Sequence, residues 1–225
     1  METKTFGEPN SLPPYNDLEG VSELTSLPDA ASHRDVDKIV LAASSDAVKT
    51  AVIAPPTIYG RGRGPGNQRS IQVYALAART LKDGQAPLLG RGLTEWDNVH
   101  IYDLSDLYVL FLGAIAANDK SLDKELWGTN GYFLAENGTH IWGEVSKQVA
   151  EAAFDQGYIK TKELKPLPVG ELKAGEFTWG RNSRGDAKRA RKYLGWKPTK
   201  NLKDEISAIV ASEAALLGLK SGNAA

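Results

Sequence analysis

The sequence predicts an α/β fold, because short apolar strand-like runs alternate along the chain with segments whose apolar residues recur at helical spacing. The composition supports a folded protein: 41% of the 225 residues are apolar and 24% are charged, which is ordinary for a soluble globular chain. This length is enough to bury a core, and it fits either one large domain or a core with a small lobe.

The first part of the chain contains one helix and one strand. Residues 1–28 hold four prolines and few apolar residues in phase, so we expect them to be irregular. The spacing of apolar residues predicts a helix over Ala30–Ala43. The β-branched run Thr50–Ala54 predicts a buried strand that is stopped by Pro55 and Pro56.

Further strands and helices follow a glycine-rich loop that begins at Pro55. We expect helices over Arg69–Lys82, Leu104–Ala116 with Asp103 as its cap, Thr139–Gln156 with Thr139 as its cap, Ser183–Gly195 and Asn201–Leu217. We expect strands over Pro87–Gly90, Val99–Ile101 and Gly131–Ala135, one or two short strands within residues 158–180, and a frayed tail.

Composition excludes several classes of function. The formal net charge of −1 argues against a dedicated nucleic-acid or anionic-membrane partner. The absence of cysteine excludes disulfides, thiolate metal sites and a cysteine nucleophile, and the three dispersed histidines predict no metal site. The longest apolar stretch, Leu107–Ala117, is too short to span a bilayer. No signal peptide is recognisable, so we expect a cytoplasmic protein.

Three segments carry a resemblance to a known family. Ile53–Gly60 (IAPPTIYG) resembles a strand end of the pattern RPPNVYGP, Val99–Leu104 (VHIYDL) resembles ihVdDva, and Leu194–Pro198 (LGWKP) resembles LGWxP. Together, in this order and spacing, they resemble the C-terminal part of the extended short-chain dehydrogenase/reductase family, also called the NAD-dependent epimerase/dehydratase family. The phrasing of residues 33–43 and 96–108 looks most like a fungal branch of that family.

The resemblance implies a fold and an activity. Residues 29–217 would form the C-terminal part of a doubly wound, Rossmann-like sheet with an interleaved small α/β substrate-binding lobe, followed by a tail over residues 218–225. A complete relative would be an NAD(P)-dependent oxidoreductase acting on a carbonyl compound, such as an aldehyde, or on an alcohol. At the carboxyl edge of the sheet, the resemblance places Pro55, Pro56 and Thr57 at the cofactor and Tyr59, Arg61, Trp96 and Asp97 at the substrate.

The family's first nucleotide-binding element has no counterpart in the sequence. That element is a strand, a glycine-rich turn and a helix whose N-terminus holds the pyrophosphate. Gly60, Gly62, Gly64 and Gly66 alternate and follow the wrong strand, so they do not form it. We therefore expect either a truncated chain or a free-standing remnant. The missing element argues against binding of NAD or NADP by this chain alone and leaves the choice between them open.

The family's Tyr-x-x-x-Lys pair is also replaced. Counting back from the strand that ends at Pro55 places Asp29 and His33 at the two catalytic positions. A shifted register places His33 and Asp37 there instead. A carboxylate–imidazole pair one helical turn apart can move a proton near neutral pH. In the structural alternative, Asp29 caps the helix and His33 packs beside it.

Two further residues bear on the substrate. In relatives that act on nucleotide sugars, an arginine stands where this chain has Trp96, and a tryptophan cannot pair with a diphosphate. The resemblance therefore favours a smaller and more apolar carbonyl substrate. Arg61 lies in a loop with two other arginines, which either contacts an anionic substrate or is simply solvated.

A second hypothesis is that the chain has no catalytic activity. A half-sheet exposes an apolar edge where further strands would pair. A non-catalytic binding or regulatory remnant would then need a homodimer or another partner to cover this edge.

Overall fold

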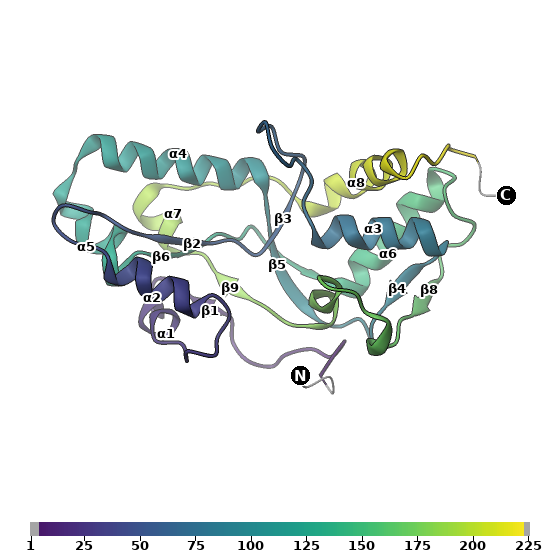
Figure 1. Ribbon diagram of the computed structural model, residues 1–225, viewed down its shortest axis with the longest axis horizontal. Coiled ribbons are helices and arrows are strands. Elements are labelled where there is room, and N and C mark those ends of the chain that lie inside the picture. The colour runs from purple at the N-terminus through teal and green to yellow at the C-terminus, as the bar shows by residue number, and fades with distance from the viewer. Residues whose placement is uncertain (1–4, 223–225) are drawn as a thin grey trace.

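The computed structural model describes residues 5–222, which form two lobes on either side of a central sheet (Figure 1). The central sheet has the strand order β3–β5–β7, with β3 at Thr57–Tyr59, β5 at Glu95–His100 and β7 at Thr139–Ile141. Strand β5 pairs in parallel with β3 and antiparallel with β7. The α/β class predicted from the alternation of elements is confirmed.

The lobe that we call the sheet lobe is built on two parallel strands, β2 (Val52–Ala54) and β6 (Tyr132–Leu134). Their side chains serve two small cores, since Tyr132 packs among residues of the first two helices and Phe133 packs toward the other face. Helices lie on both faces: α1 (Val21–Thr25) and α2 (Arg34–Ala42) on one, and α4 (Ile101–Ala117), α5 (Asp123–Leu126) and α7 (Arg189–Leu194) on the other.

The other lobe, which we call the helical lobe, has one continuous core. Its helices are α3 (Gln72–Asp83), α6 (Trp142–Asp155) and α8 (Leu202–Leu216), and its two strands, β4 (Ala86–Leu88) and β8 (Leu164–Pro166), pair in parallel. The apolar faces of these three helices pack on one another and bury Val73, Val149 and Ile209 almost completely. The helices predicted over 69–82, 139–156 and 201–217 correspond to α3, α6 and α8.

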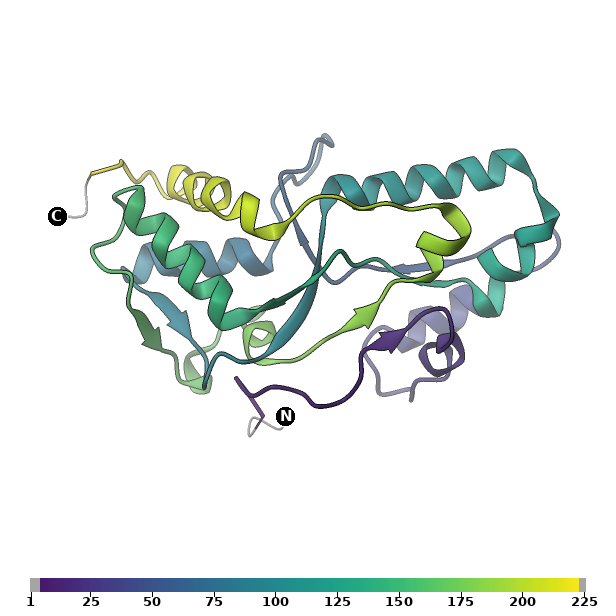
Figure 2. The same ribbon diagram turned by 180° about the vertical axis from the view of Figure 1, so that it is seen from behind.

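A two-stranded ribbon runs along the sheet lobe (Figure 2). It consists of β1 (Tyr15–Asn16) and β9 (Gly185–Asp186), which pair in parallel. Single 3-10 turns complete the described elements at Lys120–Leu122, Gly128–Asn130, Val169–Glu171 and Glu176–Gly180.

Several expected boundaries were wrong. Residues 1–28 were expected to be irregular, but they contain β1 and α1. The loop expected after Pro55 begins instead with strand β3, because the two prolines only interrupt the ladder: β2 pairs with β6, and β3 pairs with β5. The helix expected from Ser183 starts at Arg189 and is preceded by β9, although Gly195 ends it in a left-handed conformation as expected.

Two expected helix caps were also wrong. Helix α4 starts at Ile101, two residues before Asp103, and is capped by His100, whose Nδ1 accepts from the Tyr102 backbone N–H at 3.0 Å. The Asp103 carboxylate instead accepts from the backbone N–H groups of Thr199 and Lys200. Thr139 lies in strand β7 rather than at the start of α6.

Candidate functional site

A cavity of about 160 Å³ lies at the carboxyl ends of β2 and β6. Ligands of open parallel sheets bind at this edge, where successive strands end and the chain turns away. Five segments far apart in the sequence meet here, and the lining residues are Tyr15, Ala54, Pro55, Pro56, Asp97, Leu134, Ala135, Glu136, Ser183, Arg184 and Gly185.

Asp97 is the buried carboxylate of this cavity and is 2% exposed. Its Oδ1 accepts from the Thr139 hydroxyl at 2.6 Å, and its Oδ2 accepts from the Gly185 backbone N–H at 2.5 Å. Burial raises the pKa of Asp97 to about 6, and these two hydrogen bonds oppose the rise only in part. A carboxyl group with this pKa exchanges a proton with its surroundings near neutral pH.

Arg184 brings a positive charge to the same cavity. Its Nη1 donates to Glu95 Oε2 at 2.8 Å, and its Nε is buried without a partner among the described residues. Glu136 also lines the cavity, and both of its carboxylate oxygens accept hydrogen bonds, Oε2 from the Gly138 backbone N–H at 2.8 Å. Its Oε1 accepts from Arg191 Nη1 at 2.9 Å and from the Ala187 backbone, so it holds the chain around α7 rather than a ligand.

Asp17 is a second buried carboxylate, and it joins backbone segments that lie next to the cavity residues Leu134 and Gly185. It is fully buried, and its carboxylate accepts from the backbone N–H groups of Leu134, Lys188 and Arg189 at 2.8–2.9 Å. Burial raises the pKa of Asp17, while these hydrogen bonds act in the opposite direction. Asp17 therefore ties the segment after β1 to the end of β6 and to the start of α7.

The structure brings together three of the seven residues predicted for cofactor and substrate. Pro55, Pro56 and Asp97 line the cavity. The other four residues do not line this cavity. Thr57 and Tyr59 are fully buried in β3, Arg61 is exposed and donates to Gln68 Oε1 at 3.1 Å, and Trp96 packs against the core of the helical lobe.

The predicted catalytic pair is not formed. Helix α2 begins at Arg34, so Asp29 and His33 precede it instead of sharing one helical turn, and neither lines the cavity. The Asp29 carboxylate is exposed and pairs with Lys38 at 2.8 Å. His33 occupies the N-cap position in a left-handed conformation, with φ of 64°. The alternative in which Asp29 caps the helix is therefore wrong as well.

The shifted register places Asp37 where the family has its lysine. Asp37 is buried in α2, next to Tyr132 of β6. Burial, followed by the charge of Asp37 and a hydrogen bond to it, raises the pKa of Tyr132 to about 12. Asp37 thus serves the packing of α2 on the sheet, while His33 at the helix start remains exposed.

Sequence reasoning missed Arg184 and Glu136. The carboxyl-edge argument that selected Pro55 also applies to Glu136, which follows a predicted strand, so this residue could have been found. Arg184 and Gly185 could not, because they were expected inside a helix, whereas they lie at the start of β9.

The residues present do not fit a complete dinucleotide. A cavity of about 160 Å³ is smaller than the roughly 300–1,000 Å³ of pockets that enclose drug-sized ligands. Helix α3 follows the parallel strand β3 through a glycine-rich loop, but neither that loop nor α3 lines this cavity. Among residues 5–222, no helix N-terminus is therefore placed at the cavity to hold a pyrophosphate. The prolines at the end of β2 offer space for a small group only.

A parallel α/β sheet with helices on both faces and a cavity at its carboxyl edge is the arrangement of Rossmann-like proteins. Residues 4–123 match the NAD dependent epimerase/dehydratase family. An oxidase of an Acremonium species, ucsJ, is 35% identical over 96% of this chain and 65% of its own length. The chain therefore belongs to the NAD-dependent epimerase/dehydratase family.

Solved structures confirm the fold. The UDP-glucose 4-epimerase of Thermotoga maritima, solved with UDP-glucose, has a TM-score of 0.59 at 20% identity, over 96% of this chain and 62% of its own. The dTDP-glucose 4,6-dehydratase of Bacillus anthracis, solved with NAD, has a TM-score of 0.60 at 14% identity, over 92% and 57%. The chain thus spans less than two thirds of these relatives.

Two other kinds of feature are absent from the described residues. No group of three or more histidine, aspartate or glutamate side chains within residues 5–222 is arranged to hold a metal ion. In the same part of the chain, no helix combines the length and the apolar character needed to cross a membrane.

Proposed function

We propose that this chain forms the substrate side of an NAD(P)-dependent oxidoreductase that acts on a small carbonyl compound, such as an aldehyde, or on the corresponding alcohol. The observation that carries the proposal is the cavity at the end of β2, where Pro55, Pro56, the buried Asp97 and Arg184 meet. Family membership supplies the reaction class, and the chemistry of the cavity supplies the kind of substrate.

The cavity supports a small and nearly neutral substrate. Its volume of about 160 Å³ and its proline, alanine and leucine side chains suit a short apolar molecule. Trp96 stands where the resemblance expects a diphosphate-binding arginine, and Glu95 already pairs with Arg184. A nucleotide sugar would therefore find little free positive charge.

Asp97 is the residue that we assign to the carbonyl group. Near pH 6 its carboxyl is partly protonated, so it donates a hydrogen bond to a carbonyl oxygen or accepts one from an alcohol. Thr139 and Gly185 hold the carboxyl in a single orientation. The pyrophosphate of a dinucleotide is not held by this chain, so binding of NAD or NADP requires contacts from outside these residues.

The test is an NMR titration of the folded chain with propanal and propan-1-ol. We expect saturable changes at the Gly185 amide, which donates to Asp97, and at Ala135. Asp97→Asn should weaken them at least fivefold, because the neutral amide loses the titrating proton. The control Asp155→Asn changes an exposed carboxylate on α6 and should have no effect. Saturable changes confined to residues outside the cavity would overturn the proposal.

A second candidate function is a binding module without hydride transfer. It is favoured by the exposed and separated positions of Asp29 and His33 where the family has its catalytic pair. The two candidates differ in turnover: an oxidoreductase consumes NADH or NADPH when the dinucleotide is bound, whereas a binding module does not.

A further inference from the structure

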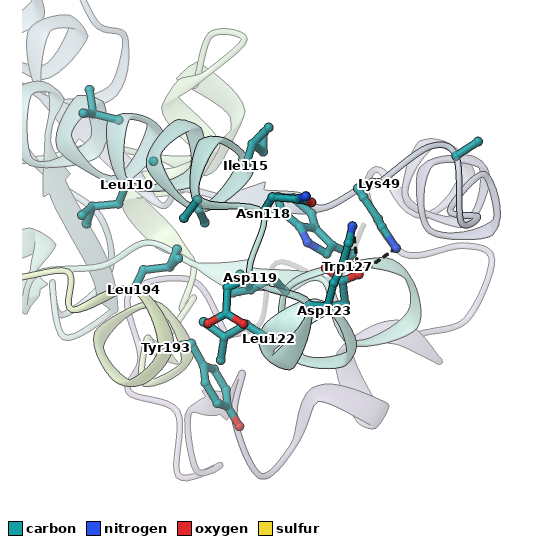
Figure 3. A pocket seen from close by; sticks show the side chains of 17 residues that line it. Lys49, Leu110, Ile115, Asn118, Asp119, Leu122, Asp123, Trp127, Tyr193 and Leu194 are labelled. Carbon is teal, nitrogen blue, oxygen red and sulfur yellow. Dashed lines mark ion pairs between the residues drawn. The ribbon is translucent and has the colours of Figure 1, made fainter.

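A groove of about 790 Å³ lies between α4, α5 and α7 in the sheet lobe (Figure 3). It shares no lining residue with the cavity that holds Asp97. Its volume falls within the roughly 300–1,000 Å³ of pockets that enclose drug-sized ligands, whereas the volume of the Asp97 cavity lies below that range. The groove is therefore large enough to hold a small molecule of its own.

The walls of the groove are apolar and partly aromatic. Helix α4 contributes Leu110 and Ile115, Trp127 follows the end of α5, and Tyr193 comes from α7 (Figure 3). The ring of Trp127 is supported by Phe111, whose centroid lies 5.8 Å away. Flat aromatic rings pack well against such walls through offset and edge-to-face contacts, so the lining favours an aromatic ligand.

The charged side chains that line the groove balance one another. Asp123 pairs with Lys49 at 3.1 Å and with Lys120 at 3.9 Å. Asp119 Oδ1 accepts from the Ser121 backbone N–H at 2.9 Å. Two acidic and two basic residues give this lining no net charge. A charged ligand would leave water without gaining a counter-ion, which is unfavourable, so the groove favours a neutral molecule.

Two polar groups of the lining are available to a ligand. The side-chain amide of Asn118 and the indole N–H of Trp127 have no hydrogen-bond partner among residues 5–222. The indole only donates a hydrogen bond, whereas the amide both donates and accepts. Apolar walls with a few polar groups are typical of small-molecule sites, where the polar groups fix the orientation of the ligand. Here they suit a hydroxyl or a carbonyl group.

Gly113 leaves space in the groove that a side chain would fill. It lies inside α4, where glycine is less favourable than alanine. A Cβ atom at this position would meet no other atom within 4 Å, so packing within the described chain does not require a glycine. Because Gly113 lines the groove, its missing side chain enlarges the room for a ligand.

We propose that this groove is a second binding site of the chain, for a neutral, fused-ring aromatic molecule that carries a hydroxyl or carbonyl group. The rings of the molecule lie against Trp127 and Tyr193, and its polar group meets the amide of Asn118 or the indole N–H of Trp127. The site goes beyond the proposed function, because it uses none of the residues of the Asp97 cavity.

The experiment is an NMR titration of the folded chain with 2-naphthol, a neutral fused-ring phenol. We expect saturable shifts of the Trp127 indole N–H and of the backbone amides of Gly113 and Asn118, which line the groove. Naphthalene-2-sulfonate has the same rings and a permanent negative charge. It should bind at least tenfold more weakly, because every lysine of the lining is already paired with Asp123.

Substitutions at Gly113 test whether the groove itself is the site. Gly113→Leu should weaken 2-naphthol binding at least tenfold, because the new side chain occupies the groove. Gly170→Leu is the matched control, since a Cβ atom at Gly170 also meets no atom within 4 Å and Gly170 does not line the groove. Gly113→Ala should raise the midpoint of thermal unfolding and weaken binding by less than Gly113→Leu, because alanine favours the helix and is small.

Four results would overturn the proposal. The first is a folded chain in which 2-naphthol gives no saturable shift at Trp127. The second is an unchanged affinity in Gly113→Leu, and the third is sulfonate binding as tight as that of 2-naphthol. The fourth is a dimer by light scattering that Gly113→Leu converts to monomers, because a second copy would then occupy the groove. These signals come from the groove rather than from Gly185, so failure here is distinct from failure to bind propanal.

Discussion

The two lobes bury their apolar residues to different degrees. In the helical lobe, α3, α6 and α8 turn their apolar faces toward one another, and Ile209 at their centre is 1% exposed. In the sheet lobe, α4 covers β6 with one side only, and Leu112 on its other side is 65% exposed. The helical lobe is thus complete as a folding unit. The sheet lobe instead leaves a large apolar helix face exposed to solvent.

The largest expected difference between the lobes is in how much the free energy of unfolding falls when an apolar side chain is truncated. Ile209→Ala should lower the free energy of unfolding by about 2–5 kcal/mol, because it opens a cavity in a filled core. Leu112→Ala should change it by less than about 0.5 kcal/mol, because that side chain touches little within the chain. Urea unfolding followed by tryptophan fluorescence measures both. Equal losses for the two variants would show that α4 is already covered.

The next effect concerns the anchor of the sheet lobe. Asp17→Ala should lower the free energy of unfolding by about 3 kcal/mol. The substitution leaves the backbone N–H groups of Leu134, Lys188 and Arg189 buried without an acceptor. Asp17→Asn keeps one acceptor oxygen and should cost less. Thermal unfolding at pH 8 compares the two variants, and an alanine variant as stable as the wild type would refute the anchoring role.

Asp97 should make stability depend on pH. Its folded pKa of about 6 lies above the unfolded value of 3.8, so the folded state binds more protons between these values. The contribution of Asp97 to the stability of the folded state is fully present below pH 4 and is lost as the pH rises through 6. Asp97→Asn should remove this loss of stability, which amounts to about 3 kcal/mol for a shift from 3.8 to about 6. Unfolding measured from pH 4 to pH 7 tests the difference, and parallel profiles for both proteins would contradict it.

The smallest effect is expected at the position predicted to be catalytic. Asp29→Ala removes an exposed ion pair with Lys38 and should leave both the unfolding midpoint and propanal binding unchanged. The same NMR titration measures this variant beside Asp97→Asn. If Asp29→Ala weakened propanal binding as much as Asp97→Asn, Asp29 would have to be part of the binding site.

The sequence predicts the fold well where apolar spacing and tertiary packing agree. The helices at 69–82 and 201–217 have one apolar stripe each, and their packing partner is the same core. The family motif selected Pro55 and Pro56 at a strand end, where ligands of parallel sheets bind, and the selected Asp97, which lies within β5, lines the same cavity.

The remaining errors have local physical causes. Strand β3 was missed because two prolines precede it, although they fall between two ladders. The pair of Asp29 and His33 was drawn on a helix that starts only at Arg34, since no spacing rule shows that His33 adopts a left-handed conformation. Arg184 was expected inside a helix, because its extended conformation just before β9 depends on the distant β1, whose Tyr15 N–H donates to Arg184 O at 3.1 Å.

The most direct test is calorimetry of NADH and NADPH with the folded, monodisperse chain. We expect no saturable heat from the chain alone, because residues 5–222 place no helix N-terminus for a pyrophosphate at the cavity. Micromolar binding of either dinucleotide by the chain alone would contradict the claim that these residues hold only the substrate side of the site.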